Sequence, residues 1–169
     1  MLNSEKLAIL LVLVGAGSRL LHLPPNIAAV TGVTIFAGFA IRNIWLALVV
    51  PIAAMALADV ILGWYNEAIF TYVGMSAGVF LARGLLHPLT PVRLIGTTFL
   101  ASLVFFVLSN LGVFVSGYYG YSLEGLIACY VAAIPFWQNS LIADFMSTAL
   151  VFAIYLGLTR AIPSVKVQA

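Results

Sequence analysis

The chain has 169 residues, of which 64% are hydrophobic and only 7% are charged, and its formal net charge is +2. With a mean hydropathy of +1.18, it lacks the polar residues needed to cover a soluble globule of this size. The basic residues stand singly beside apolar runs, so they indicate topology and exclude a nucleic-acid partner. Composition predicts an integral membrane protein whose first partner is the lipid bilayer.

Several apolar runs are long enough for spanning helices, and no alternating pattern of barrel strands occurs. We therefore expect an all-α integral membrane protein, a single transmembrane domain over residues 1–169 with about six helices. The expected helices cover residues 5–21, 27–41, 45–63, 68–86, 94–115 and 140–160. The second run is short for a bilayer core of roughly 30 Å. Its small residues, among them Gly32 and Gly38, favour a place against other helices.

Residues 116–139 break the helical pattern. A cluster of glycine and tyrosine opens the segment, and the apolar stretch from Leu123 to Ile134 is too short to cross a bilayer. We expect a structured outer loop between helices 5 and 6, with a short helix lying on the mouth of the bundle.

Lys and Arg residues are distributed unevenly between the two predicted faces. With six spans, one face collects Lys6, Arg42, Arg83, Arg93, Arg160 and Lys166, and the other has only Arg19. Because positive residues favour the cytoplasmic side, we expect a multi-pass protein of the cytoplasmic (inner) membrane with both termini in the cytoplasm.

The stretch WLALVVPIAAMALADVILG, residues 45–63, carries the acid Asp59 within an apolar run. A carboxylate at membrane depth costs several kcal/mol unless it meets a cation, water or a proton, so it marks a functional position by default. Arg19 could neutralise Asp59 or Asp144 and tie helices together, or these charges could bind a ligand. The sequence leaves both interpretations open.

Polar and aromatic residues converge on the predicted outer mouth. Aromatic faces with a few fixed polar groups are typical of a small-molecule pocket. The candidate substrate-binding residues are Arg19, His22, Asn26, Asp59, Asn66, Tyr72, Asn110, Tyr119, Glu124, Trp137, Gln138, Asn139 and Asp144. An interfacial aromatic belt explains the tyrosines taken singly, Tyr65, Tyr118 and Tyr121 included. It does not explain Asn110 and Asp144, which lie inside helical runs.

Enzyme motifs are absent from the sequence. It has no GxSxG, HExxH, phosphate-binding GxxxxGK or dinucleotide-binding glycine pattern. His22 and His87 fall on opposite predicted faces, and Cys129 is the single cysteine, which is most often a small apolar residue in this context. We therefore expect a protein that is not an enzyme and has no cofactor and no metal, although His22 alone could ligate one.

The order RLLHLPPNIAAVTGVTIFAGF, ALADVILG, FFVLSNLGVF and GLIACYVAAIPFWQNSLIADF resembles an uncharacterised family of small bacterial membrane proteins assigned to transport. The resemblance runs from about Arg19 to Phe152. More distantly, the layout is similar to the substrate-binding S components of energy-coupling factor vitamin transporters, including the solitary cobalamin type.

The S-component resemblance implies about six helices and a vitamin-sized pocket on the outer face. By position, Asn26, Asn66 and the loop from Tyr118 to Gln138 would be its gates. Two features depart from that pattern. The alanine-rich docking face of the first helix reads Ala8, Val12, Ala16, and the cobalamin-type cysteine near the end of the third helix is missing. Cobalamin is therefore one candidate among several small solutes.

The leading hypothesis is binding and uptake of a small, vitamin-like or cofactor-like solute, alone or with other transporter subunits. Because the sequence carries no ATP-binding motif, any drive by ATP must come from another chain. The alternative is a non-catalytic structural subunit of a larger membrane complex. In that case the small-residue faces of the second and fourth helices would pack on partners.

Overall fold

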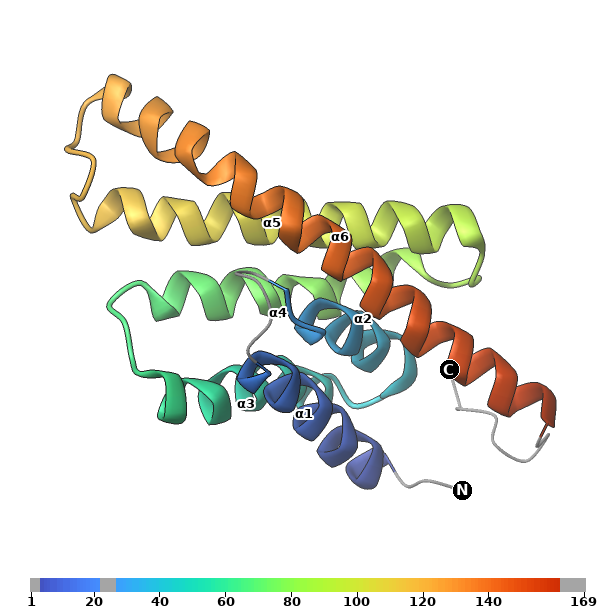
Figure 1. Cartoon of the computed structure of the whole chain (residues 1–169). Helices are drawn as coiled ribbons and strands as arrows, with labels where there is room; N and C mark the ends of the chain where they lie inside the picture. The colour runs from blue at the N-terminus through green and yellow to red at the C-terminus, as the bar shows by residue number, and fades with distance from the viewer. Residues whose placement is uncertain (1–3, 22–26, 162–169) are drawn as a thin grey trace.

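The structure is a computed structural model that describes residues 4–21 and 27–161, and all regular secondary structure in these residues is helical. In chain order the helices are α1 (Ser4–Leu20), α2 (Val30–Ala40), α3 (Ile44–Leu62), α4 (Ala68–Leu85), α5 (Pro91–Val115) and α6 (Leu123–Ala161) (Figure 1). The predicted all-helical bundle is thus confirmed for the described residues. Four helices, α3 to α6, are long and apolar enough to cross a membrane.

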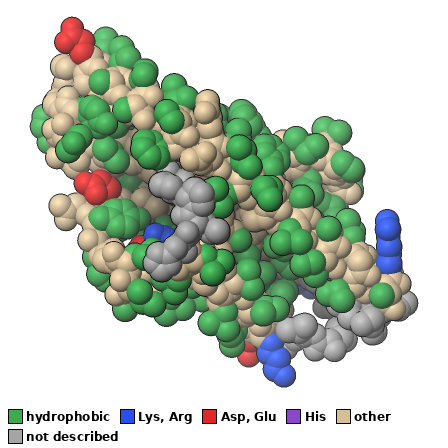
Figure 2. Space-filling model, viewed as in Figure 1, with side chains coloured by type: hydrophobic (Ala, Val, Ile, Leu, Met, Phe, Trp, Pro, Cys, Tyr) green, Lys and Arg blue, Asp and Glu red, His purple; other side chains and the backbone are tan. Residues whose placement is uncertain are grey.

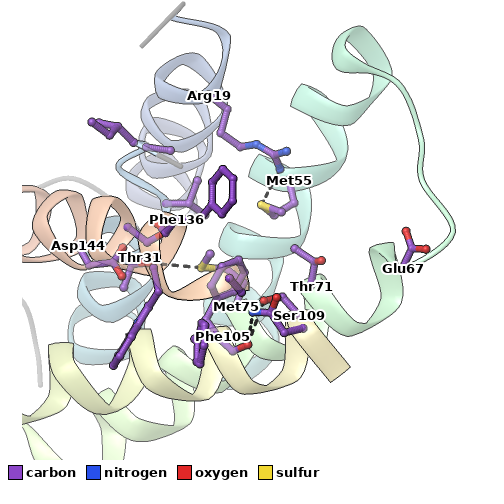
Figure 3. Close-up of a pocket in the computed structure, with 18 of the residues that line it drawn as sticks. Arg19, Thr31, Met55, Glu67, Thr71, Met75, Phe105, Ser109, Phe136 and Asp144 are labelled. Carbon is purple, nitrogen blue, oxygen red and sulfur yellow. Dashed lines mark hydrogen bonds between the residues drawn. The ribbon is translucent and has the colours of Figure 1, made fainter. Parts of the chain in front are cut away.

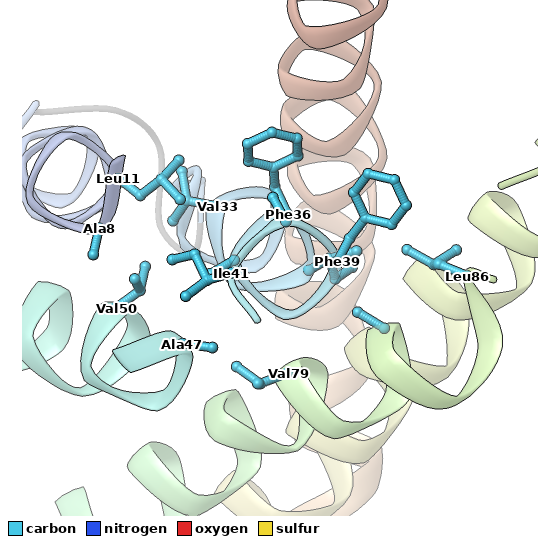
Figure 4. Packing of buried hydrophobic residues seen from close by; sticks show 14 of the residues in the cluster. Ala8, Leu11, Val33, Phe36, Phe39, Ile41, Ala47, Val50, Val79 and Leu86 are labelled. Atoms are coloured by element: carbon cyan, nitrogen blue, oxygen red, sulfur yellow. The ribbon is translucent and has the colours of Figure 1, made fainter. Parts of the chain in front are cut away.

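Helix α2 is the centre of the bundle. All of its 11 residues are buried, and it packs against each of the other five helices. Figure 4 shows its side chains Val33, Phe36 and Phe39 among those of neighbouring helices. At 1.5 Å per residue α2 is about 16 Å long, roughly half of a bilayer core. It is therefore enclosed by protein and is too short to cross on its own.

Two glycines let neighbouring helices approach α2 closely. A Cβ atom on Gly32 would lie 2.6 Å from the backbone carbon of Ser147 in α6, and one on Gly38 would lie 2.5 Å from the carbonyl oxygen of Val79 in α4. No real Cβ fits at such distances, so both positions require glycine. The small residues predicted to serve close helix contacts do so inside this chain.

Helix α2 begins three residues later than expected. The Ser18 hydroxyl of α1 accepts a hydrogen bond from the backbone N–H of Ala29 at 2.9 Å. This bond satisfies a backbone donor that the start of a helix leaves without a partner of its own. The segment that enters α2 is therefore tied to α1, a contact between distant residues that periodicity does not reveal.

The predicted break between helices 5 and 6 is wrong. Only residues 116–122 form a link, and α6 then runs without interruption for 39 residues through Pro135. A proline removes one backbone hydrogen bond and bends a helix, but the turns on either side can continue. The apolar stretch from Leu123 to Ile134, expected as a separate short helix, is the first third of one long helix of about 58 Å.

The bundle has two distinct ends (Figure 1). The described start of α1, the end of α6 and the α2–α3 and α4–α5 links lie at one end, and the α3–α4 and α5–α6 links lie at the other. Arg42, Arg83, Arg93 and Arg160 belong to elements at the first end. In Figure 2 most of the visible basic side chains lie toward that end, and most acidic ones lie toward the other. Lys166 lies outside the described residues.

Polar groups at the basic end complete the helix termini. Asn43 precedes α3, and its side-chain oxygen accepts from the backbone N–H of Trp45 at 2.9 Å, as an N-cap residue does. Arg83 donates to the carbonyl oxygens of Ile41 and Arg42 beyond the end of α2. These bonds satisfy backbone groups that helix ends leave free, so several charges at this end have structural roles.

Candidate functional site

A cavity of about 550 Å³ lies at the end of the bundle opposite the basic end. All six helices and two of the links contribute to it, and part of its lining is drawn in Figure 3. The lining consists of Arg19, Leu21, Ile27, Ala28, Val30, Thr31, Met55, Leu62, Tyr65, Glu67, Thr71, Met75, Phe105, Phe106, Ser109, Asn110, Val113, Ala133, Phe136, Trp137, Ser140 and Asp144. Its volume lies within the range of small-molecule sites, about 300–1,000 Å³.

The sequence left open which acid Arg19 pairs with, and the structure gives Asp59. The Arg19 Nη2 atom lies 2.8 Å from Asp59 Oδ1 and forms an ion pair with it. The Oδ1 atom accepts no hydrogen bond in this geometry. The Tyr72 hydroxyl donates to Asp59 Oδ2 at 2.7 Å. Arg19 Nη1 also lies 2.7 Å from the sulfur of Met55. Three helices, α1, α3 and α4, are joined through one carboxylate.

Asp59 is not part of the cavity wall. Its side chain is almost wholly buried, at 1% exposure, while that of Arg19 keeps 18%. Because the guanidinium reaches the cavity and the carboxylate does not, Asp59 acts on the site through Arg19 and holds it in place. The structural interpretation of this acid is the one that the geometry favours.

Asp144 is placed differently. This residue of α6 lines the cavity and is only 5% exposed, and its Oδ2 atom has no hydrogen-bond partner. The hydroxyl-bearing residues Thr31 and Ser102 lie beside the carboxyl, and Figure 3 shows Asp144 next to Thr31. Within the described part of the cavity lining the one cation is Arg19, and it pairs with Asp59. Asp144 is therefore a buried carboxylate with no cation beside it among the described residues of the lining.

Aromatic rings form one wall of the cavity. Trp137 of α6 stacks on Phe106 of α5 with ring centroids 4.8 Å apart and planes 25° apart. The indole N–H donates to the Ser102 hydroxyl at 3.1 Å, so this polar tip is satisfied and the flat ring remains as wall. Asn110 donates from Nδ2 to the carbonyl of Phe106 at 2.8 Å, within its own helix. Its side-chain oxygen is the part left for a ligand.

The α3–α4 link borders the cavity through Tyr65 and Glu67. Burial raises the pKa of Tyr65, and the nearby Asp59 carboxylate adds to this effect, while Thr71 and Arg19 oppose it. The tyrosine hydroxyl thus stays protonated to a higher pH than in water. It can donate a hydrogen bond at the cavity edge throughout the physiological range.

The structure brings together only some of the predicted site residues. Arg19, Asn110, Trp137 and Asp144 line the cavity, and Asp59 and Tyr72 adjoin it through Arg19. The cavity lining does not include Asn66, Tyr119, Glu124, Gln138 and Asn139. His22 and Asn26 lie outside the described residues.

Four of the predicted site residues, Tyr119, Glu124, Gln138 and Asn139, lie outside the cavity because α6 is one continuous helix. Glu124 and Gln138 are exposed on the long helix, and Asn139 is half-buried. Tyr119, in the short link before α6, packs edge-on against Tyr118 with ring centroids 5.2 Å apart. An outer loop folded over the mouth would have brought these side chains inward, whereas a continuous helix carries its first third along α5.

Apolar and hydroxyl side chains of the wall were missed by the sequence reasoning. Met55, Met75, Phe105, Phe136 and Thr71 all line the cavity. Residues that line this cavity and residues on the outer faces of the helices are both apolar, so periodicity does not separate them. Thr71, like Thr31 and Ser109 of the same lining, was an available signal, because a hydroxyl in an apolar run seeks a polar neighbour.

No group of three or more potential metal-ligating side chains occurs within residues 4–21 and 27–161. Cys129 is buried and donates weakly to the carbonyl of Asn110, with sulfur and oxygen 3.5 Å apart. His87 belongs to the α4–α5 link at the basic end, where it stacks on Phe39 with ring centroids 5.2 Å apart. Neither residue faces the cavity.

The fold and the site define an all-helical protein with four helices that could cross a membrane and a solute-sized cavity at one end. The chain belongs to DUF6580, a family of unknown function, whose model matches residues 2–165. No curated protein and no solved structure matches it. The similarity to S components therefore stays a prediction from the sequence motifs.

Proposed function

We propose that this protein is a multi-pass protein of the cytoplasmic membrane that binds a small solute in the cavity at its outer end and takes part in its uptake. Large apolar side chains cover the outward faces of the long helices, among them Ile52, Val60, Val92 and Leu150, all exposed. Lipid is the solvent that suits such a surface.

Orientation rests on the distribution of charge. Four arginines, Arg42, Arg83, Arg93 and Arg160, belong to elements at the basic end of the bundle. Because positive residues favour the cytoplasmic side, this end is the cytoplasmic one. The cavity then opens toward the outside. This placement agrees with solute capture from outside the cell, and both termini are cytoplasmic in it.

The observation that carries the solute-binding proposal is the cavity itself. It combines a volume of about 550 Å³, an aromatic wall and a few polar groups fixed by their neighbours, which is the usual make-up of a small-molecule site. Ion pairing and hydrogen bonds hold Arg19, while Trp137 is oriented by Ser102. A site held in this way loses little conformational entropy when a ligand enters.

Movement of the solute inward requires the bundle to open or tilt, alone or with partner subunits. Helix α2 blocks the direct path, because it lies across the centre and is buried on every side. Passage therefore needs displacement of α2 or of the whole bundle, and another chain would have to supply any ATP-driven step.

The alternative, a structural subunit of a larger complex, is supported less well by the packing. The small faces of α2 and α4 were its proposed docking surfaces. On α2, Gly32 packs against α6 and Gly38 packs against α4. On α4, Gly74 packs against Phe105 and Gly78 against Thr34. These faces are occupied within the chain, which leaves no small-residue face on α2 free for another subunit.

A thermal-shift screen of the detergent-purified protein against vitamins, cobalamins, nucleobases and amino acids tests the proposal. A ligand that binds only the native state raises its stability by about 2.7 kcal/mol at a hundredfold excess over Kd. We expect a hit that Asn110→Ala weakens and the exposed control Gln138→Ala does not. Silence across the set together with a co-purifying partner would instead favour the complex-subunit function.

A further inference from the structure

The charges that face the cavity do not balance. Three acidic or basic side chains of the described residues line it, Arg19, Glu67 and Asp144. The guanidinium of Arg19 is already paired with Asp59 at 2.8 Å, and Asp59 lies outside the cavity wall. The charge of Arg19 is thus neutralised by Asp59, a residue that does not line the cavity. Among the described residues, the cavity is left with two carboxylates and no free cation.

The two carboxylates differ in how they are placed. Glu67 lies in the link at the edge of the cavity and is only half-buried, so water can solvate it. Asp144 is 5% exposed and its Oδ2 atom lacks a partner. A buried carboxylate of this kind gains most from an arriving positive charge, because burial has removed its water and only hydroxyl-bearing neighbours, Thr31 and Ser102, lie beside it. The polar anchor of the site is therefore Asp144.

The walls near Asp144 suit an organic cation more than a bare metal ion. Phe136 and Trp137 follow one another on α6 about two turns before Asp144. Phe106 of α5 stacks on Trp137, and Phe105 belongs to the same lining. Aromatic faces attract ammonium groups through their quadrupoles, most strongly where water is excluded. Metal ions prefer several oxygen ligands, whereas the described residues hold no group of three candidate metal-ligating side chains.

We propose that the solute of this site is an organic cation, a molecule with a protonated or quaternary amine whose nitrogen lies against Asp144 and whose body rests on the aromatic wall. This inference rests on the proposed solute-binding function and narrows its ligand class. A volume of about 550 Å³ leaves room for a body well beyond the ammonium group itself.

Probes that share shape and differ in charge test the inference. Choline and its uncharged carbon isostere 3,3-dimethylbutan-1-ol have the same outline, and 3,3-dimethylbutyrate adds a negative counterpart; benzyltrimethylammonium extends the cation by a ring. Binding of each is measured by isothermal titration to the full chain in nanodiscs, with empty nanodiscs as the blank. We expect saturable binding of both cations, at least about tenfold tighter than that of the neutral isostere.

Three variants of α6 test whether the preference for positive charge depends on Asp144. Asp144→Asn should weaken the cations at least about tenfold and leave the neutral isostere unchanged, whereas Asp144→Glu should keep the preference for positive charge. Glu124→Gln makes the same acid-to-amide change at an exposed position of the same helix and should bind like wild type. Should Asp144→Asn fail to fold, the charge series on wild type and on Asp144→Glu still decides.

The outcomes separate this inference from the function on which it rests. Equal affinity for choline and its neutral isostere, tighter binding of the anion, or undiminished cation binding by Asp144→Asn would overturn the cation assignment while leaving a solute-binding cavity. No saturable binding by any probe, combined with a silent solute screen, would overturn both.

Discussion

Removal of the Asp59 carboxylate is the most direct test of how the site is held. Asp59→Asn keeps the shape of the side chain and its capacity to accept from Tyr72, but it removes the charge that lies 2.8 Å from Arg19. Breaking a buried ion pair by removing one partner costs about 3–5 kcal/mol. Because the Arg19 side chain is 18% exposed, water can still solvate the guanidinium after its partner is removed. We therefore expect the lower end of that range, a loss of about 3 kcal/mol in the free energy of unfolding.

A double-mutant cycle shows how much of this loss of stability comes from the contact between Arg19 and Asp59. Arg19→Gln leaves Asp59 buried and unpaired, so it should cost at least as much as Asp59→Asn. The double variant removes both charges and should cost little more than either single one, with a coupling energy of about 2–3 kcal/mol. The exposed control Glu124→Gln should stay within about 0.5 kcal/mol of wild type.

The assay is unfolding in mixed detergent micelles, followed by circular dichroism during SDS titration and by thermal denaturation. A loss of about 3 kcal/mol corresponds to a fall in Tm of roughly 6–12 °C for a chain of this size. Full additivity of the two single losses would refute the reasoning, because it would mean that Arg19 and Asp59 act independently in spite of their contact.

Three further predictions concern packing, capping and pH. Gly32→Ala should strongly destabilise the bundle in the same assay, because its Cβ would meet the α6 backbone at 2.6 Å, while Gly157→Ala, whose Cβ would meet nothing within 4 Å, should be neutral or slightly stabilising. Asn43→Ala should cost about 1 kcal/mol through loss of the α3 cap, and Asn43→Asp should restore most of it. The raised pKa of Tyr65 makes stability fall as pH rises above the unfolded value of about 10. Tyr65→Phe should flatten that alkaline fall in Tm, and an unchanged slope would contradict the assignment.

Much of the helical layout could be predicted, because it depends on local composition. Long apolar runs bounded by Asn43, Gly63 and Thr90 placed α3, α4 and α5 within a few residues of their observed positions. Caps and turn residues act over one helical turn, so a sequence displays them directly. Residues 116–139 were misleading for the same reason: their glycine and tyrosine cluster and short apolar stretch predicted a separate loop with a short helix, whereas α6 begins at Leu123 and continues through Pro135.

The site was predictable only in part. Polar residues in apolar runs stand out, which is how Arg19, Asp59, Asn110 and Asp144 were found. Their partners are not visible in a sequence, since Arg19 could have paired with either acid. The choice depends on which helices pack together, and α1 packs on α3.

The sequence by itself determined the all-helical fold class, the long apolar runs and the asymmetry of charge, because each follows from composition and from spacing along the chain. Only the tertiary structure decided that α2 lies at the centre, that Arg19 is bound by Asp59, and that Asp144 is left alone in a cavity. These outcomes arise from contacts between residues far apart in the chain, and such contacts are fixed when helices pack.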